Sequence, residues 1–139
     1  MKNSYKIIDH TADFGIHVFG SNPKELFANA ALAMFDVITD LELLTGLKAR
    51  KVHIRADDWP DLMVNWLREL LYLWAGKEML VKHVDILSIS EYELTALVYV
   101  DRYDLNRHVI NNEIKAVTYH QIQVQDGPSG WESQVIFDV

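Results

Sequence analysis

The chain has 139 residues, of which half are hydrophobic and 24% are charged. This length is typical of one domain, and this balance is typical of a globular chain rather than a disordered one. Cysteine is absent, which excludes disulfides, thiolate zinc sites, iron–sulfur clusters and thiol nucleophiles. The formal net charge of −7 argues against broad binding of a phosphate backbone and favours a basic protein partner or a bound cation.

No segment of the sequence predicts export or membrane insertion. The first residues, Met1 to Tyr5, lack the apolar region of a signal peptide. No apolar run approaches the 18 or so residues that a transmembrane helix needs. We therefore expect a cytoplasmic protein without a membrane partner.

The first third of the chain predicts two strands and a helix. Strands at 5–8 and 14–19 flank a polar segment, and Asn22, Pro23 and Glu25 are typical of a capped helix start. Apolar residues then recur every three or four positions, which predicts a helix with one buried face. These residues are Leu26, Phe27, Ala30, Ala31, Met34, Phe35 and Ile38.

A strand and a second helix follow. Residues 50–56 alternate between apolar and basic side chains, and the acids around Trp59-Pro60 are typical of a helix N-terminus. This helix is apolar over more than half its circumference, so we expect it to be the most buried element and to end at Gly76. We expect core positions for its three tryptophans, Trp59, Trp66 and Trp74.

The remainder of the chain is rich in β-prone residues. We expect strands at 80–89, 94–100, 113–125 and 131–139, with a polar loop at 101–112. Strands at both ends with helices between them predict an α+β fold. The expected architecture is a single domain over residues 1–139: a largely antiparallel or mixed β-sheet with two main helices packed on one side.

The polar segment 9–13 is the first candidate site. Two carboxylates and the His10 imidazole fall within five residues, which suits a divalent cation or acid–base chemistry. The alternative is a polar turn whose side chains satisfy backbone amides, and spacing alone favours the turn.

The C-terminal residues Asp138 and Val139 are the second candidate. A side-chain carboxylate and the chain-terminal carboxylate would form a cluster of hard oxygen donors. The alternative is a solvated tail, although the apolar run 135–137 indicates that the end is tied into the sheet. If Asp138 lies near Asp13, the two acidic clusters combine into one cation site.

The third candidate is basic. Arg107, His108, Lys115 and His120 could face phosphate or carboxylate groups. The favoured alternative is a half-exposed edge strand in which Lys115, Val117 and Tyr119 share one face. We expect three further histidines to be surface or satisfied side chains: His17, His53 and His83.

Several segments together resemble the archease family, nearly along the whole chain. They are Asp9-His10-Thr11-Ala12-Asp13-Phe14-Gly15-Ile16, Phe19-Gly20-Ser21, Glu25-Leu26-Phe27, Ala30 to Asp36, Trp66 to Tyr72, Arg107-His108, Ile114 to His120 and Val135 to Val139. The chain departs from the pattern before Arg107, where Asp104-Leu105-Asn106 lacks a proline found in many members. Residues 41–58 carry little of the signature.

The resemblance implies a protein that assists the GTP-dependent RNA-splicing ligase in tRNA splicing without being an enzyme itself. Such proteins promote guanylylation of the ligase and its repeated turnover. The resemblance also implies a metal site formed by Asp13, Asp138 and Val139, the last through main-chain or terminal carboxylate oxygen. Hard oxygen donors favour Ca²⁺, with Mg²⁺ or Mn²⁺ as alternatives. His10, Arg107, His108 and Lys115 are the candidate partner-contact residues.

Two other functions stay open. The same cluster, His10, Asp13 and Asp138, could serve a metal-dependent phosphodiesterase or phosphatase, although such enzymes usually need more ligands. A chaperone-like module that binds partners through a sheet edge or an apolar patch is the second alternative.

Overall fold

The computed structural model describes residues 4–9 and 13–139, and for residues 7–9 and 13 it describes the backbone alone. Its elements, in chain order, are β1 (Tyr5–Asp9), β2 (Asp13–Gly20), α1 (Pro23–Ile38), a 3₁₀ turn (Leu41–Leu43), β3 (Lys48–Arg55), α2 (Trp59–Lys77), β4 (Met79–Ile89), β5 (Glu93–Arg102), β6 (Ala116–Val117), β7 (Gln123–Gly127) and β8 (Gly130–Asp138). None of the described helices is both long and apolar enough to cross a membrane.

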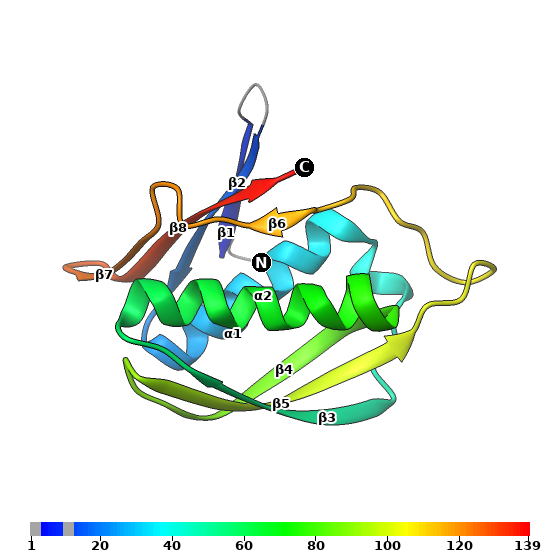
Figure 1. Ribbon diagram of the computed structural model, residues 1–139, viewed down its shortest axis with the longest axis horizontal. Helices are drawn as coiled ribbons and strands as arrows, with labels where there is room; N and C mark the ends of the chain where they lie inside the picture. The colour runs from blue at the N-terminus through cyan, green and yellow to red at the C-terminus, as the bar shows by residue number, and fades with distance from the viewer. Residues whose placement is uncertain (1–3, 10–12) are drawn as a thin grey trace.

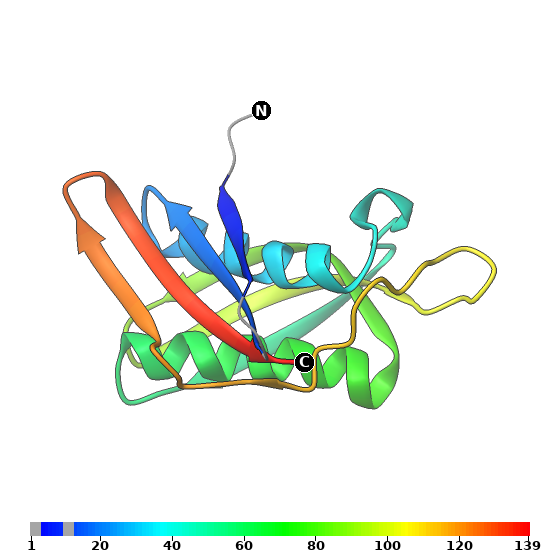
Figure 2. The same cartoon turned by 90° about the horizontal axis from the view of Figure 1, so that it is seen from above.

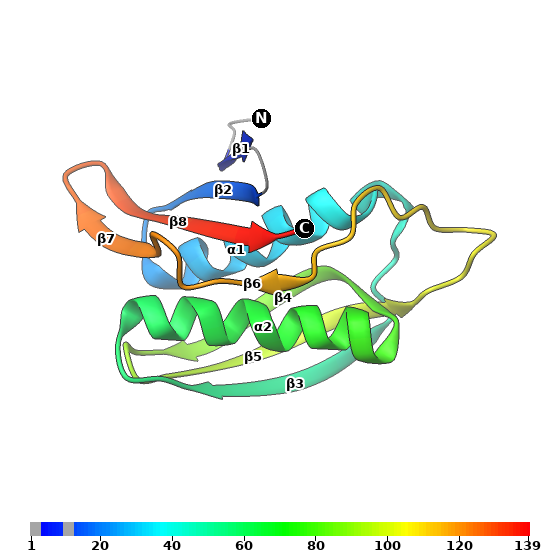
Figure 3. The same ribbon diagram turned by 45° about the horizontal axis from the view of Figure 1, so that its top comes forward.

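The α+β class is confirmed, and the strands form two antiparallel sheets rather than one. The larger sheet has the order β1-β2-β8-β6, with β7 also paired to β8, and the smaller has the order β3-β5-β4. Both helices lie between the two sheets (Figure 1; Figure 3), so each sheet covers a different side of the helical layer. The prediction of helices packed on one side of a single sheet was therefore wrong, because the helices pack against both sheets.

Helix α1 begins as its capping residues predict. The Asn22 side chain accepts a hydrogen bond from the Glu25 amide at 2.9 Å, and the Glu25 carboxylate accepts one from the Ser21 amide at 2.9 Å. Both bonds satisfy amides at the start of the helix, where intrahelical acceptors are lacking. Local side-chain chemistry therefore fixes the first residue of this helix.

Helix α1 is the more buried of the two helices, which corrects the prediction for α2. It contacts β2 on one side and β4 on the other, and nine of its 16 residues are buried. Helix α2 buries eight of 19 residues. The indole N–H of Trp66 donates to the Phe27 carbonyl at 2.9 Å, which joins the two helices inside the core.

The end of α2 lies beyond the predicted stop. The helix continues through Gly76 to Lys77, and Glu78 caps it in the left-handed conformation at φ 56°. Gly76 instead provides room for a neighbouring ring, because a Cβ there would lie 2.6 Å from the Tyr72 side chain. In the sequence, a glycine that lies against a side chain within a helix looks the same as a glycine that ends one.

Candidate cation site and partner surface

The pairing of β2 with β8 brings the two predicted acidic clusters together. In the backbone register Asp13 lies opposite Asp138, and Asp138 also lies opposite Ala116 of β6. The Lys115 amide donates to the Asp138 carbonyl at 2.7 Å. The C-terminal end of β8 therefore lies between the start of β2 and β6 (Figure 1).

The end of the chain is tied into the sheet, as its apolar run predicts. Val135, Ile136 and Phe137 are buried, whereas Asp138 and Val139 are exposed. Burial of the preceding strand holds the exposed residues at a defined place on the larger sheet. Asp138 is therefore presented to solvent from a fixed backbone.

The described side chains do not by themselves assemble a metal centre. Among them no group of three His, Cys, Asp or Glu residues converges. His10 lies outside the described residues, and Asp13 is described by its backbone alone. A cation site at this position needs the Asp13 side chain or main-chain oxygens in addition to Asp138.

Lys115 lies beside this end of the larger sheet. Its side chain is exposed, and it lines a cavity of about 270 Å³ together with Arg68 of α2. Arg68 donates from Nε to the Val117 carbonyl at 3.1 Å, and its guanidinium carbon lies 4.7 Å from the centre of the Tyr119 ring. Two cations therefore line this cavity beside β6.

The predicted face shared by Lys115, Val117 and Tyr119 is wrong. Val117 is buried, whereas Lys115 and Tyr119 are exposed. The regular strand covers only Ala116–Val117, so the alternation of a long strand is not maintained around it. The expected strand 113–125 is divided between β6 and β7.

His108 and Arg107 have different environments. The Arg107 side chain is exposed, whereas His108 is 4% exposed. Nδ1 of His108 accepts a hydrogen bond from the Asp104 amide at 3.0 Å, and Nε2 lies 3.5 Å from the Asp101 carboxylate. This placement gives His108 the role of positioning the loop, and it leaves Arg107 as the exposed member of the pair.

Asp101 is a buried functional group that the sequence did not single out. Its carboxylate accepts hydrogen bonds from the Thr45 amide at 2.7 Å, the Thr45 hydroxyl at 2.9 Å, the Gly46 amide at 2.7 Å and the Leu47 amide at 3.4 Å. Burial raises the pKa of Asp101, but these hydrogen bonds outweigh burial and hold the pKa below its usual value. The carboxylate thus connects residues 45–47 to the end of β5.

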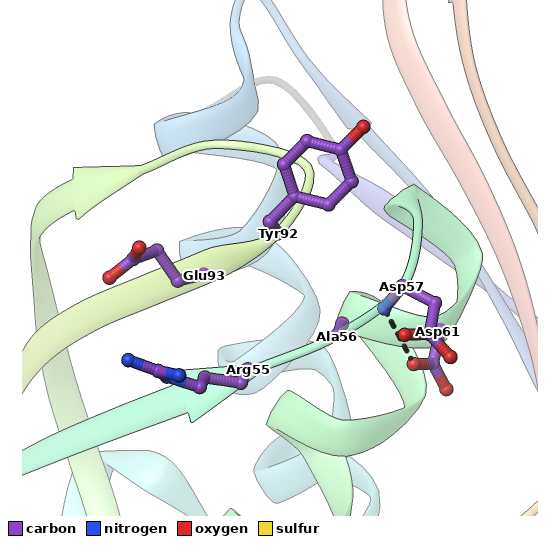
Figure 4. Close-up of a pocket in the computed structure, with 6 residues that line it drawn as sticks. All are labelled: Arg55, Ala56, Asp57, Asp61, Tyr92 and Glu93. Carbon is purple, nitrogen blue, oxygen red and sulfur yellow. Dashed lines mark hydrogen bonds between the residues drawn. The ribbon is translucent and has the colours of Figure 1, made fainter.

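The acids at the start of α2 have the structural role that their position predicts. Asp58 caps the helix by accepting from the Asp61 amide at 2.9 Å, and Asp61 accepts from the Asp57 amide at 3.0 Å. Asp57 and Asp61 border a cavity of about 450 Å³ whose other wall includes Arg55 and Glu93 (Figure 4). Helix capping therefore accounts for these acids.

The hydroxyl of Tyr119 connects the start of α2 to the segment after β6. It donates to Asp61 Oδ1 at 2.7 Å. This hydrogen bond is the main reason that the pKa of Asp61 is lowered and the pKa of Tyr119 is raised.

His17, His53 and His83 are exposed or partly exposed, as predicted, and each has an acidic neighbour. His17 lies 3.5 Å from Glu132, His53 lies 3.6 Å from Glu93, and His83 lies 3.0 Å from Asp85. All three pairs are on outer faces or strand edges, so they do not form a common site.

Comparison with known proteins identifies the family. Residues 5–139 match the model of the Archease protein family (MTH1598/TM1083). The chain belongs to the archease family. It is 39% identical to the protein archease of Methanosarcina barkeri, over 97% of this chain and 95% of that one. It is 34% identical to an archease-like protein of Drosophila melanogaster, over 97% of this chain and 90% of that one.

Solved archease-family structures share the fold. The solution structure of protein 1598 of Methanobacterium thermoautotrophicum is similar with a TM-score of 0.83 and 30% identity, covering 98% of this chain and 99% of that one. A crystal structure from Thermotoga maritima, described as an archease and possible chaperone, has a TM-score of 0.65 at 18% identity and covers all of both chains. The second likeness shows the fold alone.

Proposed function

We propose that this chain is a non-catalytic activator of a GTP-dependent RNA-splicing ligase, which promotes guanylylation of the ligase and repeated turnover in tRNA splicing. Membership of the archease family supports the proposal. The structural observation that carries the site is the register of β2 and β8, which sets Asp13 opposite Asp138.

A divalent cation fits this position for an electrostatic reason. Residues directly opposite on antiparallel strands have Cβ atoms about 4.5–5.5 Å apart, and like charges there are destabilising. A bound cation removes that repulsion, and carboxylate and main-chain oxygens are the donors that Ca²⁺ and Mg²⁺ prefer. We assign the cation to Asp13, Asp138 and main-chain oxygen of Val139, with Ca²⁺ favoured over Mg²⁺ or Mn²⁺.

The chemistry of this site is electrostatic and positional. When bound, the cation would supply positive charge close to a carboxylate cluster. The chain's own contribution is to hold Asp138 at the end of a buried strand, so that its carboxylate meets the partner in a fixed orientation. In this proposal the cluster favours a productive arrangement of the ligase's own nucleotide and metals.

Exposed cations on the segment that leads into β6 are candidate contacts with the ligase. Lys115 lies at the β6 edge of the site, and Arg107 is exposed on the preceding loop. His10 belongs to the same proposal by its place in the sequence. Each can pair with a carboxylate or phosphate of the complex.

The test is multiple-turnover ligation of tRNA exon halves by the cognate ligase. We expect Asp13→Asn and Asp138→Asn to reduce stimulation at least tenfold and to lower the fraction of guanylylated ligase. Asp126→Asn, an exposed acid at the β7–β8 turn, removes the same charge and serves as the matched control. Calorimetric titration with Ca²⁺ gives a readout of the cation site that is independent of ligation.

Different outcomes contradict different parts of the proposal. If the unaltered protein fails to stimulate the ligase, the activator function is wrong. If it stimulates and both variants do so equally, the assignment of the site is wrong. Hydrolysis of RNA or nucleotide without ligase, lost in Asp13→Asn, would instead favour the phosphodiesterase alternative.

A further inference from the structure

A third cavity, of about 490 Å³, lies between the end of α2 and the segment that follows β5. This volume is within the range of known ligand pockets. Its wall combines aromatic, aliphatic and acidic side chains. The main ones are Trp74, Glu78, Tyr103, Ile110, Glu113 and Ile114.

Backbone geometry fixes the aromatic part of this wall. The left-handed cap residue Glu78 donates its amide to the Trp74 carbonyl at 2.8 Å and accepts from the Tyr103 amide at 2.8 Å. The rings of Trp74 and Tyr103 meet edge to face, with centroids 5.5 Å apart and planes at 81°. The buried His108 ring lies 6.2 Å behind Tyr103. These contacts hold the aromatic wall in place before any partner binds.

The charge of the cavity has a single sign. Glu78 and Glu113 are exposed acids, and none of the described residues that line the cavity is Lys, Arg or His. Within the part of the chain that the structure describes, neither glutamate forms an ion pair. Two unpaired carboxylates thus stand beside an aromatic and aliphatic wall.

We propose that this cavity binds an arginine side chain on an exposed segment of a partner protein. The apolar stem of arginine packs on aliphatic and aromatic walls while its guanidinium remains at the charged rim. The guanidinium plane also stacks on aromatic rings and forms bidentate hydrogen bonds with carboxylates, which an ammonium group does not. Charge complementarity and the aromatic wall together select this occupant.

The arginine cavity is connected to the β6 side of the proposed cation site through the smaller cavity of about 270 Å³. This smaller cavity, lined by Arg68 and Lys115, shares Ala75 with the arginine cavity. The Lys115 amide in turn donates to the Asp138 carbonyl at 2.7 Å. One continuous surface along α2 can therefore hold the partner and present Asp138 to it. The identity of this partner as the ligase rests on the proposed function, whereas the preference for arginine does not.

Nuclear magnetic resonance titration of the isolated chain tests the preference directly. The probe is the peptide acetyl-Leu-Arg-Leu-amide, and its citrulline twin, which has the same shape without the charge, is the control ligand. We expect the arginine peptide to shift the Trp74 indole N–H and the amides of Glu78 and Glu113, with at least tenfold weaker binding of the citrulline peptide. Equal binding of both peptides, or shifts scattered over the surface, would overturn the proposal.

A charge-matched pair of variants separates the cavity from general electrostatics. We expect Glu78→Gln/Glu113→Gln to weaken the arginine peptide at least tenfold. The control pair Glu42→Gln/Asp126→Asn removes two exposed acids elsewhere and should leave binding unchanged. If the two pairs weaken binding equally, net charge rather than the cavity explains the effect and the proposal fails.

Two further outcomes distinguish this inference from the proposed function. Asp138→Asn should bind the arginine peptide normally even if it no longer stimulates the ligase. A loss of arginine binding in that variant would contradict a separate cavity. If the Trp74 and Glu113 signals move with protein concentration alone and not with peptide, the cavity is a contact between copies of the chain and the proposal is overturned.

Discussion

Replacement of Asp101 by asparagine tests whether one buried carboxylate holds three segments of the chain together. The carboxylate accepts hydrogen bonds from Thr45, Gly46 and Leu47, and it lies 3.5 Å from Nε2 of His108. An asparagine side chain keeps one acceptor oxygen and presents an N–H₂ group to donors that need an acceptor. The substitution therefore leaves partly buried N–H groups without an acceptor and does not change the size of the side chain.

The expected loss of stability follows from the number of these bonds. A hydrogen bond to a charged group contributes about 1.5–3 kcal/mol, and an unpaired buried donor costs about 1–3 kcal/mol. Because bonds that share one acceptor are not additive, we expect Asp101→Asn to reduce the free energy of unfolding by about 3 kcal/mol. For a chain of this length that corresponds to a fall in Tm of roughly 10 °C.

The loss should depend on pH with a defined sign. The pKa of Asp101 is held below its usual value in the folded chain, so its stabilisation is complete above the unfolded pKa of about 3.9 and disappears as pH falls through the folded pKa. Urea unfolding followed by tryptophan fluorescence at pH 7, 5 and 3 measures the difference between the variant and the unaltered protein. We expect the difference to be constant between pH 7 and 5 and to shrink at pH 3.

Asp126→Asn is the control, because that acid is exposed and should change stability by less than about 0.5 kcal/mol. If Asp101→Asn behaves like this control at pH 7, the hydrogen bonds do not stabilise the fold as argued here. A difference at pH 3 equal to that at pH 7 would refute the role of the ionised carboxylate.

Three further predictions concern the core, a turn and the start of α2. Trp66→Phe loses the buried hydrogen bond to Phe27 and part of a ring, and calorimetry should show a loss of about 2 kcal/mol. Gly130→Ala should cost about 1–3 kcal/mol in urea unfolding, because φ is +111° and a Cβ would lie 2.9 Å from a carbonyl oxygen of β2. Tyr119→Phe should move the pKa of Asp61 upward toward its usual value, which an NMR titration of the carboxyl carbon measures; an unchanged pKa would contradict the hydrogen bond as its main cause.

Local chemistry was predictable from sequence because its partners are near in the chain. The capping bonds of Glu25 with Asn22 and with Ser21 join residues three and four positions apart, so the sequence contains the whole interaction. The tie of the C-terminal strand into the sheet was predictable for a related reason, since the run 135–137 is too apolar to remain in solvent. In both cases the residues that determine the structure lie within a few positions of one another in the sequence.

Long-range chemistry was not predictable in the same way. The donors to Asp101 come from residues 45–47, more than 50 positions away, and no local pattern connects them. The register of Asp13 with Asp138 joins segments near the two ends of the chain. The sequence alone could say only that the two acids would form one site if they lay close together. Fold-level pairing decides both, and the family resemblance supplied what local patterns could not.

The division of the expected strand 113–125 has a geometric cause. One edge of β8 is occupied by β2 along its length, so β6 and β7 must share the other edge. Val117 pairs with Phe137, and Gln123 pairs with Gln134. The segment from Val117 to Gln123 is therefore longer than the stretch of β8 that it runs beside. Residues 118–122 therefore loop out, with Gln121 in the left-handed conformation at φ 53°.

The charges that sum to −7 are unevenly distributed over the molecule. Four of the 13 basic residues lie on β3, an edge strand, where charged side chains also prevent pairing with another chain. Strand β3 and the C-terminal end of β8 lie on opposite sides of the molecule (Figure 1; Figure 2 gives the view from above). The proposed cation site thus lies away from this basic edge. A basic partner is attracted toward the carboxylates of that site and repelled from β3, so charge can orient the encounter before contact is made.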